Sequence, residues 1–287
     1  RLWKARIRAY GSLVKSPQTA LLLVTGLAGY SSARCPVISW ATVGGLAGSL
    51  FLAIAGSTVL NMVLDRDIDR SMQRTCRRPL PSQRIGPMEA AVFGISMSVL
   101  GVGWALLLSP LYGGLILGGI FFDLVIYTLW LKRRTAWSIV WGGIAGAMPV
   151  LAGRALGTGQ IDWIAAALGL AVLFWIPTHI MTFNMRHDQD YRRAGIPTFP
   201  SRYGLRITRM TIAASSVLAA LAMALAAVGI GMAWGYLRLL GVLASGMLLL
   251  AMKALRRPSE HVNFGLFKYA SLFMLSAMAL VMVETLL

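Results

Sequence analysis

Runs of about 20 apolar residues recur along the whole chain and are separated by short polar segments. Each run is long enough to cross the hydrocarbon core of a bilayer as a helix. Prolines stand near several edges of these runs, where a missing backbone N–H costs least. The pattern predicts one all-helical membrane domain, 1–287, with nine spans. The predicted spans are roughly 17–33, 38–62, 87–108, 111–131, 136–156, 161–183, 208–229, 233–253 and 264–286.

The composition supports a membrane protein over a soluble one. The 287 residues are 57% hydrophobic and 13% charged, and the mean hydropathy is +0.69. A soluble domain typically carries about 25% charged residues, so the charge is too sparse for that class. The two cysteines, Cys35 and Cys76, lie far apart and match neither a disulfide framework nor a zinc site.

The chain has a net charge of +17, and its basic residues lie mainly in the segments between the predicted spans. All but three of its 27 lysines and arginines fall on one side of the predicted spans, and the three exceptions are Arg34, Arg154 and Arg238. This is the positive-inside pattern, which predicts a cytoplasmic N-terminus in a plasma-membrane protein and, with nine spans, an external C-terminus. Topology therefore explains the basic residues, and a nucleic-acid partner is not expected.

Five of the ten acidic residues fall in two short clusters, each after an apolar span. In the first cluster Asn61, Asp65 and Asp69 are four residues apart, so on a helix they share one face. Asp67 would lie on a different face of that helix. Oxygen ligands along one helix edge suit Mg²⁺, which favours carboxylates together with substrate phosphate.

The second cluster repeats the opening of the first, with Asn184, Asp188 and Asp190 in the same frame and Arg192 in place of the last aspartate. Both clusters face the predicted cytoplasmic side. Together they predict a Mg²⁺ site that holds a diphosphate. The alternative is that both are solvated helix ends paired with neighbouring arginines.

Basic residues near the clusters are candidates for binding the diphosphate oxygens. The same residues are expected at a cytoplasmic membrane edge for topological reasons alone, and lysines there extend toward water. The candidates are Lys15, Arg66, Arg74, Arg78 and Lys132.

Several segments resemble the UbiA superfamily of intramembrane prenyltransferases, and the likeness covers nearly the whole chain. The first acidic motif has the amino-acid sequence typical of the branch that farnesylates protohaem IX. The matching segments are Asp65-Arg66-Asp67-Ile68-Asp69, Arg74-Thr75, Arg78-Pro79-Leu80-Pro81, Tyr127-Thr128, Leu131-Lys132-Arg133-Arg134-Thr135, Pro177-x-His179, Asp190-Tyr191 and Leu266-Phe267-Lys268-Tyr269.

The resemblance implies nine helices around a central cavity, in which an isoprenyl diphosphate binds head-first from the cytoplasmic side. It implies Mg²⁺ held by Asn61 and by four catalytic aspartates, and substrate contacts from the basic candidates, Asn184, Tyr127 and His179. Aromatic residues are expected to line the cavity and to shield a carbocation from water. The aspartates are Asp65, Asp69, Asp188 and Asp190, and the aromatic candidates are Phe121, Phe122, Trp175 and Phe183.

The acceptor stays open at this point. The haem branch usually lacks the Asn184/Asp188 pair, carries aromatic residues where Ile180 and Met181 stand, and often has an aromatic residue in place of Asp123. Protohaem, 4-hydroxybenzoate or another quinone precursor, and a glycerol-phosphate lipid are therefore all candidates. A polytopic transporter is the alternative of a different class, although its repeats are usually inverted and meet at the bilayer midplane.

Overall fold

The computed structural model describes residues 2–14, 16–34 and 39–286, and every regular element in them is a helix. The elements are α1 (Leu2–Leu13), α2 (Ser16–Ser31), α3 (Trp40–Leu64), α4 (Arg66–Ser71), α5 (Pro87–Leu108), α6 (Pro110–Phe121), the π-helix η1 (Phe122–Leu131), α7 (Ser138–Thr158), α8 (Trp163–Arg186), α9 (Asp188–Arg193), α10 (Phe199–Ile230), α11 (Trp234–Arg256) and α12 (Glu260–Leu286).

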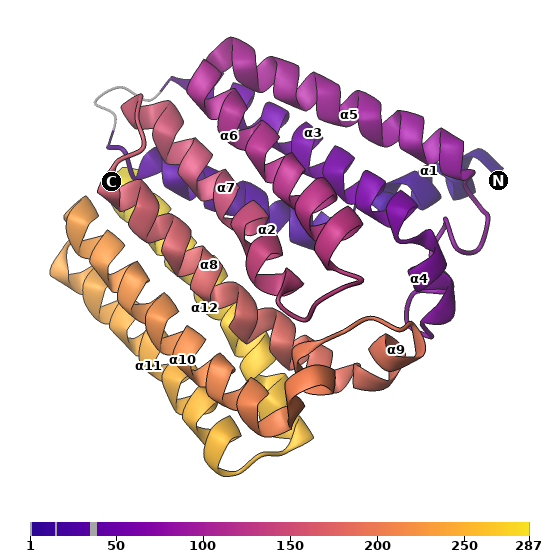
Figure 1. Ribbon diagram of the computed structural model, residues 1–287. Coiled ribbons are helices and arrows are strands. Elements are labelled where there is room, and N and C mark those ends of the chain that lie inside the picture. The colour runs from indigo at the N-terminus through magenta and orange to yellow at the C-terminus, as the bar shows by residue number, and fades with distance from the viewer. Residues whose placement is uncertain (1, 15, 35–38, 287) are drawn as a thin grey trace.

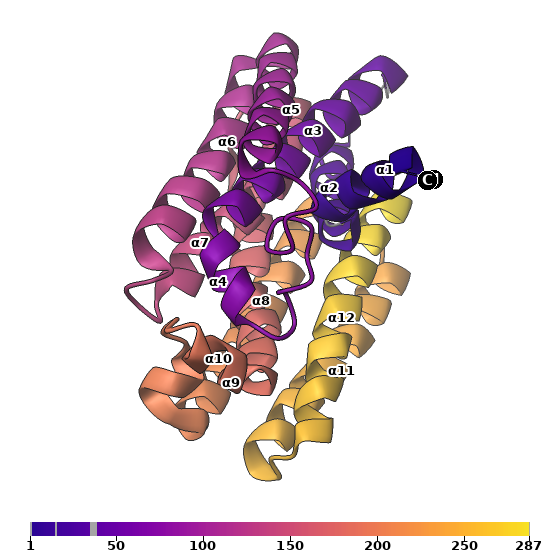
Figure 2. The same cartoon turned by 90° about the vertical axis from the view of Figure 1, so that its right-hand side faces the viewer.

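The long helices lie side by side in one bundle (Figures 1 and 2). The most extensive contacts join α3 to α5, α8 to α10, and α7 to both α2 and α8. The short helices α4 and α9 lie at one end, which we call the motif end, and the C-terminal end of α12 lies at the other (Figure 1). Large apolar side chains such as Leu107, Trp234 and Leu249 are exposed on the outside, as expected for helices that face lipid.

Each of the nine predicted spans corresponds to a helical segment of the structure, but only eight of these segments have the length expected of a membrane span. Eight helices in the described residues are long and apolar enough to cross a membrane, with α6 and η1 together as one. The remaining segment, α2, has 16 residues and would span only about 24 Å at the α-helical rise. A count of nine spans and a cytoplasmic N-terminus therefore stay predictions.

Glycines allow α2 to pack closely on α7. A Cβ atom added at Gly153 would lie 1.9 Å from the carbonyl oxygen of Gly26, and one added at Gly29 would lie 2.2 Å from that of Val150. Small residues permit this backbone approach between membrane helices. The short helix is thus integral to the bundle.

Three local features differ from the predicted pattern. The span expected at 208–229 begins earlier, at Phe199, and the chain bends at Gly204, whose φ of 80° suits glycine. The span at 111–131 changes from α-helix to π-helix at Phe122. The helices α1, α4 and α9 lie in segments where the apolar pattern predicts no span.

Ion pairs hold the end of the bundle opposite the motifs. Arg154 donates from Nε and Nη2 to Asp162 at 2.8 and 2.7 Å, and from Nη1 to the carbonyl oxygen of Ser32 at 2.6 Å. Arg34 pairs with Glu284 at 2.8 Å. Two of the three basic residues predicted on this side therefore have carboxylate partners there.

Candidate active site

The two acidic motifs come together at the motif end. Ile68 of the first motif and Met72, three residues after the motif ends, pack with Ile196, which follows α9. The backbone N–H of Gln73 also donates to Asp190 at 3.3 Å. The sequence prediction that both clusters lie on one face of the protein agrees with this geometry (Figures 1 and 2).

The spacing of the first motif predicted one continuous helix, but the structure divides the motif between two helices. Helix α3 ends at Leu64, Asp65 has φ −92° and ψ 7°, and α4 begins at Arg66. Backbone bonds from Asp65 N to Asn61 O (2.9 Å) and from Asp69 N to Asp65 O (2.8 Å) nevertheless cross the break. The four-residue hydrogen-bonding register therefore survives the bend.

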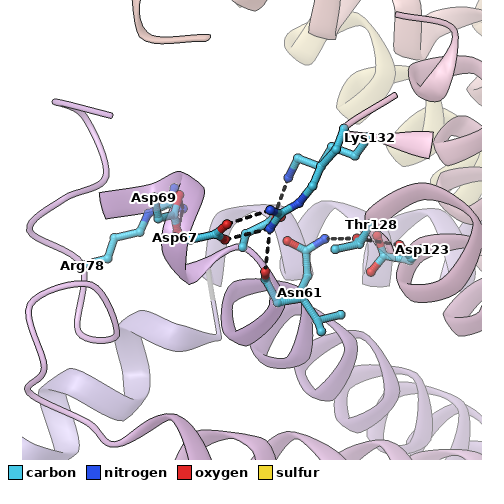
Figure 3. A network of polar contacts seen from close by, with 10 residues as sticks. Asn61, Asp67, Asp69, Arg78, Asp123, Thr128 and Lys132 are labelled. Atoms are coloured by element: carbon cyan, nitrogen blue, oxygen red, sulfur yellow. Dashed lines mark hydrogen bonds and ion pairs between the residues drawn. The ribbon is translucent and has the colours of Figure 1, made fainter. Parts of the chain in front are cut away.

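Asp67 points away from the other motif residues, as expected. Its side chain is exposed and accepts from Arg133 at 2.6 and 2.7 Å, an ion pair drawn in Figure 3. The hydrogen bond from Arg133 lowers the pKa of the Asp67 carboxyl. Asp67 is thus an exposed ion-pair partner rather than part of the buried set.

Asp65 is 4% exposed and forms an ion pair with Lys132, which follows η1. The other carboxylate oxygen of Asp65, Oδ1, is buried without a hydrogen-bond partner. The Lys132 ammonium also lies 5.4 Å from the centroid of the Tyr127 ring, within cation–π range. A buried carboxylate oxygen without a donor can accept a further ligand.

Asp69 is 5% exposed and pairs with Arg78, whose Nη1 lies 3.0 and 2.9 Å from its two carboxylate oxygens. Arg78 belongs to the loop after α4, so this contact ties the loop to the motif (Figure 3). Lys132 and Arg78, two of the predicted diphosphate-binding residues, are therefore both in contact with predicted metal ligands.

A polar chain that the sequence did not reveal links the first motif to η1. Asn61 donates from Nδ2 to Thr128 Oγ1 at 2.7 Å, and Thr128 donates to the backbone oxygen of Asp123 at 2.7 Å (Figure 3). The widened π turn places a carbonyl five residues back within reach, and such turns are frequent at functional sites. The Asp123 carboxylate accepts from Ser57 Oγ at 2.6 Å.

The second motif bends at His187, between α8 and α9. Asn184 and Asp190 are buried, at 7% and 9% exposure. Asp188 accepts from Arg192 at 2.6 Å through Oδ2, whereas its Oδ1 is buried without a partner. Each motif thus contributes one aspartate with an unpartnered, buried oxygen.

A cavity of about 680 Å³ opens among the helices. Tyr127 and His179, both predicted substrate contacts, line it together with Asp123. Of the four aromatic candidates only Trp175 does so, which corrects the prediction for the other three. Phe121 is 48% exposed, because it lies on the outward side of its helix.

The remaining predicted residues are less closely associated with the buried carboxylates. The guanidinium of Arg74 lies 4.9 Å from the centroid of the Phe183 ring, and neither residue lines the cavity. Arg66 is exposed on α4. Lys15 lies outside the described residues.

The motif residues fit a magnesium ion that is shared with a substrate. Within residues 2–14, 16–34 and 39–286, no group of three or more His, Cys, Asp or Glu side chains is close enough to hold a metal alone. Mg²⁺ needs no such cage, since it is usually bound by one or two carboxylates, waters and substrate phosphates. The free oxygens of Asp65 and Asp188 meet that requirement.

The family model described as "UbiA prenyltransferase family" matches residues 22–277. The chain belongs to this family. It is therefore a multi-pass membrane prenyltransferase, as the resemblance predicted, and this favours prenyl transfer over the transporter alternative.

Its relatives include proteins named protoheme IX farnesyltransferase. The one from Archaeoglobus fulgidus is 41% identical over 221 residues, which cover 75% of this chain and 77% of the relative. The one from Pyrobaculum islandicum is 33% identical over 268 residues, covering 91% and 94%.

Solved structures of related proteins share the fold. A structure of digeranylgeranylglyceryl phosphate synthase matches with a TM-score of 0.81 and 19% identity, covering 98% of this chain and 99% of that one. A UbiA homologue from Archaeoglobus fulgidus bound to GPP and Mg²⁺ matches with a TM-score of 0.70 and 15% identity, covering 96% and 99%. At these identities the likeness establishes the fold alone.

Proposed function

We propose that this chain transfers a farnesyl group from farnesyl diphosphate to protohaem IX, with Mg²⁺, at a site that faces the cytoplasm from the plasma membrane. The proposal rests on one structural observation. Tyr127 lines the cavity and touches Lys132, and Lys132 pairs with the buried Asp65. The acidic motif site is therefore adjacent, through Tyr127, to a largely apolar cavity, as an amphipathic substrate requires.

Asp65, Asp69, Asp188 and Asp190 would hold Mg²⁺, and Asn61 would add an amide oxygen to the set. The unpartnered oxygens of Asp65 and Asp188 support this assignment, as does the Mg²⁺ bound with GPP in the UbiA homologue. When bound, Mg²⁺ supplies positive charge that stabilises the diphosphate leaving group. Asn184, buried beside Asp188, would position the second motif.

Lys132 and Arg78 would bind the diphosphate oxygens. Both cations contact the motif aspartates, so they lie where a diphosphate bound to these aspartates through Mg²⁺ would place its charge. Hydrogen bonds from fixed cations favour departure of the diphosphate more than binding of the intact ester. Arg66, Arg74 and Lys15 are further candidates for the outer part of this site.

The cavity would then surround the carbocation that forms when the diphosphate leaves. Cleavage of the allylic C–O bond leaves both bonding electrons on the diphosphate and a positive charge on the prenyl carbon. The apolar lining excludes water from that carbon, and the Tyr127 face can stabilise it. An electron-rich vinyl carbon of the acceptor would then supply its π electron pair to the new C–C bond. The positive charge that this leaves on the neighbouring vinyl carbon would be neutralised by addition of water and loss of a proton.

The choice of haem over other acceptors follows from the relatives, which are 33–41% identical over most of the chain. The similarity to digeranylgeranylglyceryl phosphate synthase is one of fold, at 19% sequence identity. It supports the fold and keeps a glycerol-phosphate lipid as the second candidate acceptor.

An acceptor panel tests the proposal. Purified protein in lipid nanodiscs is given Mg²⁺, radiolabelled farnesyl diphosphate and either protohaem IX, 4-hydroxybenzoate or a prenylated glycerol phosphate. We expect a farnesylated product with protohaem and its loss in the Asp65→Asn/Asp188→Asn variant. Product with another acceptor alone would overturn the haem assignment, and no Mg²⁺-dependent diphosphate release with any acceptor would overturn the mechanism.

A further inference from the structure

The His179 ring in the cavity is held rigidly from both faces. The Trp175 ring stacks on one face, with centroids 4.9 Å apart and an interplanar angle of 19°. Phe267 of α12 stacks on the other, at 4.5 Å and 23°. Only the edges of the imidazole, which carry its two nitrogen atoms, remain available for interaction.

The hydrogen bonds of Ser271 assign the proton on one of these edges. Ser271 Oγ lies 3.1 Å from His179 Nδ1 and donates to the backbone oxygen of Phe267 at 3.2 Å. A hydroxyl has one proton to donate, so when Ser271 donates it to Phe267 it accepts from a protonated Nδ1. In a neutral imidazole the other nitrogen, Nε2, then carries a lone pair.

Nε2 makes no hydrogen bond to any of the described residues, and His179 lines the cavity. A histidine used only for packing is expected to have both nitrogen atoms satisfied when it lies among apolar side chains. A histidine that binds a metal typically donates its second ring N–H to a protein oxygen, which fixes the ring and raises its basicity. His179 and Ser271 have that arrangement.

The metal must arrive with the substrate. Among the described residues, His179 belongs to no group of three or more His, Cys, Asp or Glu side chains that could hold a metal ion. Its neighbours in the cavity lining are Trp175, Ile176, Ile180 and Leu275. A single imidazole at an apolar wall is the usual protein ligand of haem iron. We propose that His179 Nε2 coordinates the iron of the acceptor porphyrin, an inference that rests on the haem acceptor proposed for this chain.

Coordination would set the depth of the acceptor. His179 precedes Asn184 of the second motif by five residues of α8, or roughly 7.5 Å along the helix axis. A porphyrin held there would lie deeper in the cavity than the diphosphate site. Ser271 acts as a positioning residue in this arrangement, through its hydrogen bond to Nδ1.

Titration of the purified protein with haem in nanodiscs, without farnesyl diphosphate, tests the inference. Absorption and electron paramagnetic resonance spectra should show an imidazole-bound iron in the unaltered protein and in the control His261→Gln, whose histidine is exposed on α12. His179→Gln should lose that signature and raise the haem Kd about tenfold or more, whereas the Kd of metal-free protoporphyrin IX should change less than about twofold.

Two further variants keep the test decisive if His179→Gln folds poorly. His179→Gly should regain the signature when free imidazole is added, and Ser271→Ala should keep an imidazole ligand but weaken haem binding by about tenfold through lost orientation. An unchanged spectrum in folded His179 variants overturns the coordination. If the unaltered protein farnesylates haem in that case, the proposed function stands; if it neither binds nor farnesylates haem, the proposed function is the one that fails.

Discussion

Lys132 pairs with Asp65 between segments that are 67 residues apart in the chain. The side chains are 15% and 6% exposed, so both charges are largely withdrawn from water. An isolated buried charge is costly, and each of these residues therefore depends on the other in the absence of substrate. Their contact places a cation beside a carboxylate that is proposed to hold Mg²⁺.

Replacing Lys132 by Met should lower kcat by about 100-fold, because a fixed positive charge is lost where the diphosphate departs. KM for farnesyl diphosphate should rise less. Lys132→Arg keeps the charge and should retain more activity than Lys132→Met. Steady-state release of pyrophosphate measures both constants, and a Lys132→Met enzyme within twofold of the unaltered kcat would contradict the proposed role.

Chelation should abolish prenyl transfer, and added Mg²⁺ should restore it. The Mg²⁺ concentration for half-maximal activity should rise about tenfold in Asp65→Asn and Asp188→Asn, since each loses a charged ligand oxygen. Asp67→Asn is the matched control, because Asp67 belongs to the same motif but is exposed and bound to Arg133. An equal effect in all three variants would contradict the separation of Asp67 from the metal set.

The sequence predicted the helices well because lipid imposes a simple rule. A membrane helix must be apolar over about 20 residues, so the span at 87–108 is found at Pro87–Leu108. The motifs were also recognisable, since oxygen ligands repeat at fixed spacing. The π-helix and the Asn61–Thr128 bond were not, because they depend on how α3 and η1 pack. Three of the four aromatic cavity candidates were wrong for the same reason: hydrophobicity alone does not distinguish an outward-facing Phe121 from a cavity-lining Trp175.

The close contact of α2 with α7 predicts a sharp difference between two glycines. Gly153→Ala should lower the thermal unfolding temperature markedly, at a cost of about 1–3 kcal/mol, because the new methyl group meets backbone atoms that cannot move aside. At Gly114 nothing lies within 4 Å of an added Cβ. Gly114→Ala should therefore leave the unfolding temperature unchanged or raise it slightly. Equal effects at both positions would argue against the packing described.

The membrane orientation can be tested with single cysteines in a Cys35→Ser/Cys76→Ser background. Arg70 is an exposed residue of α4 at the motif end, and Gln160 is exposed in the turn at the opposite end, so each can be replaced by cysteine. A thiol reagent that cannot cross the membrane should label only Gln160→Cys in intact cells and both variants after lysis. The reverse labelling would overturn the cytoplasmic orientation predicted from the basic residues.

The Arg154–Asp162 pair predicts how stability depends on pH at the end of the bundle away from the motifs. Hydrogen bonds from Arg154 lower the pKa of Asp162 below its ordinary value of 3.8. Because the folded-state pKa is the lower one, the stabilisation is fully present above the unfolded-state pKa and is lost as the pH falls through the folded-state pKa.

Asp162→Asn isolates this charge, because asparagine can still cap α8 by accepting from Ala165 N, as Asp162 does at 2.8 Å. The substitution leaves Arg154, which is 5% exposed, without its carboxylate. We expect a loss of about 2–3 kcal/mol at pH 7, with the kcat of the folded enzyme unchanged. The difference in unfolding temperature from the unaltered protein should be constant between pH 7 and pH 5 and should shrink below about pH 4. A difference that instead grows as the pH falls would show that the pair does not hold Asp162 in its charged form.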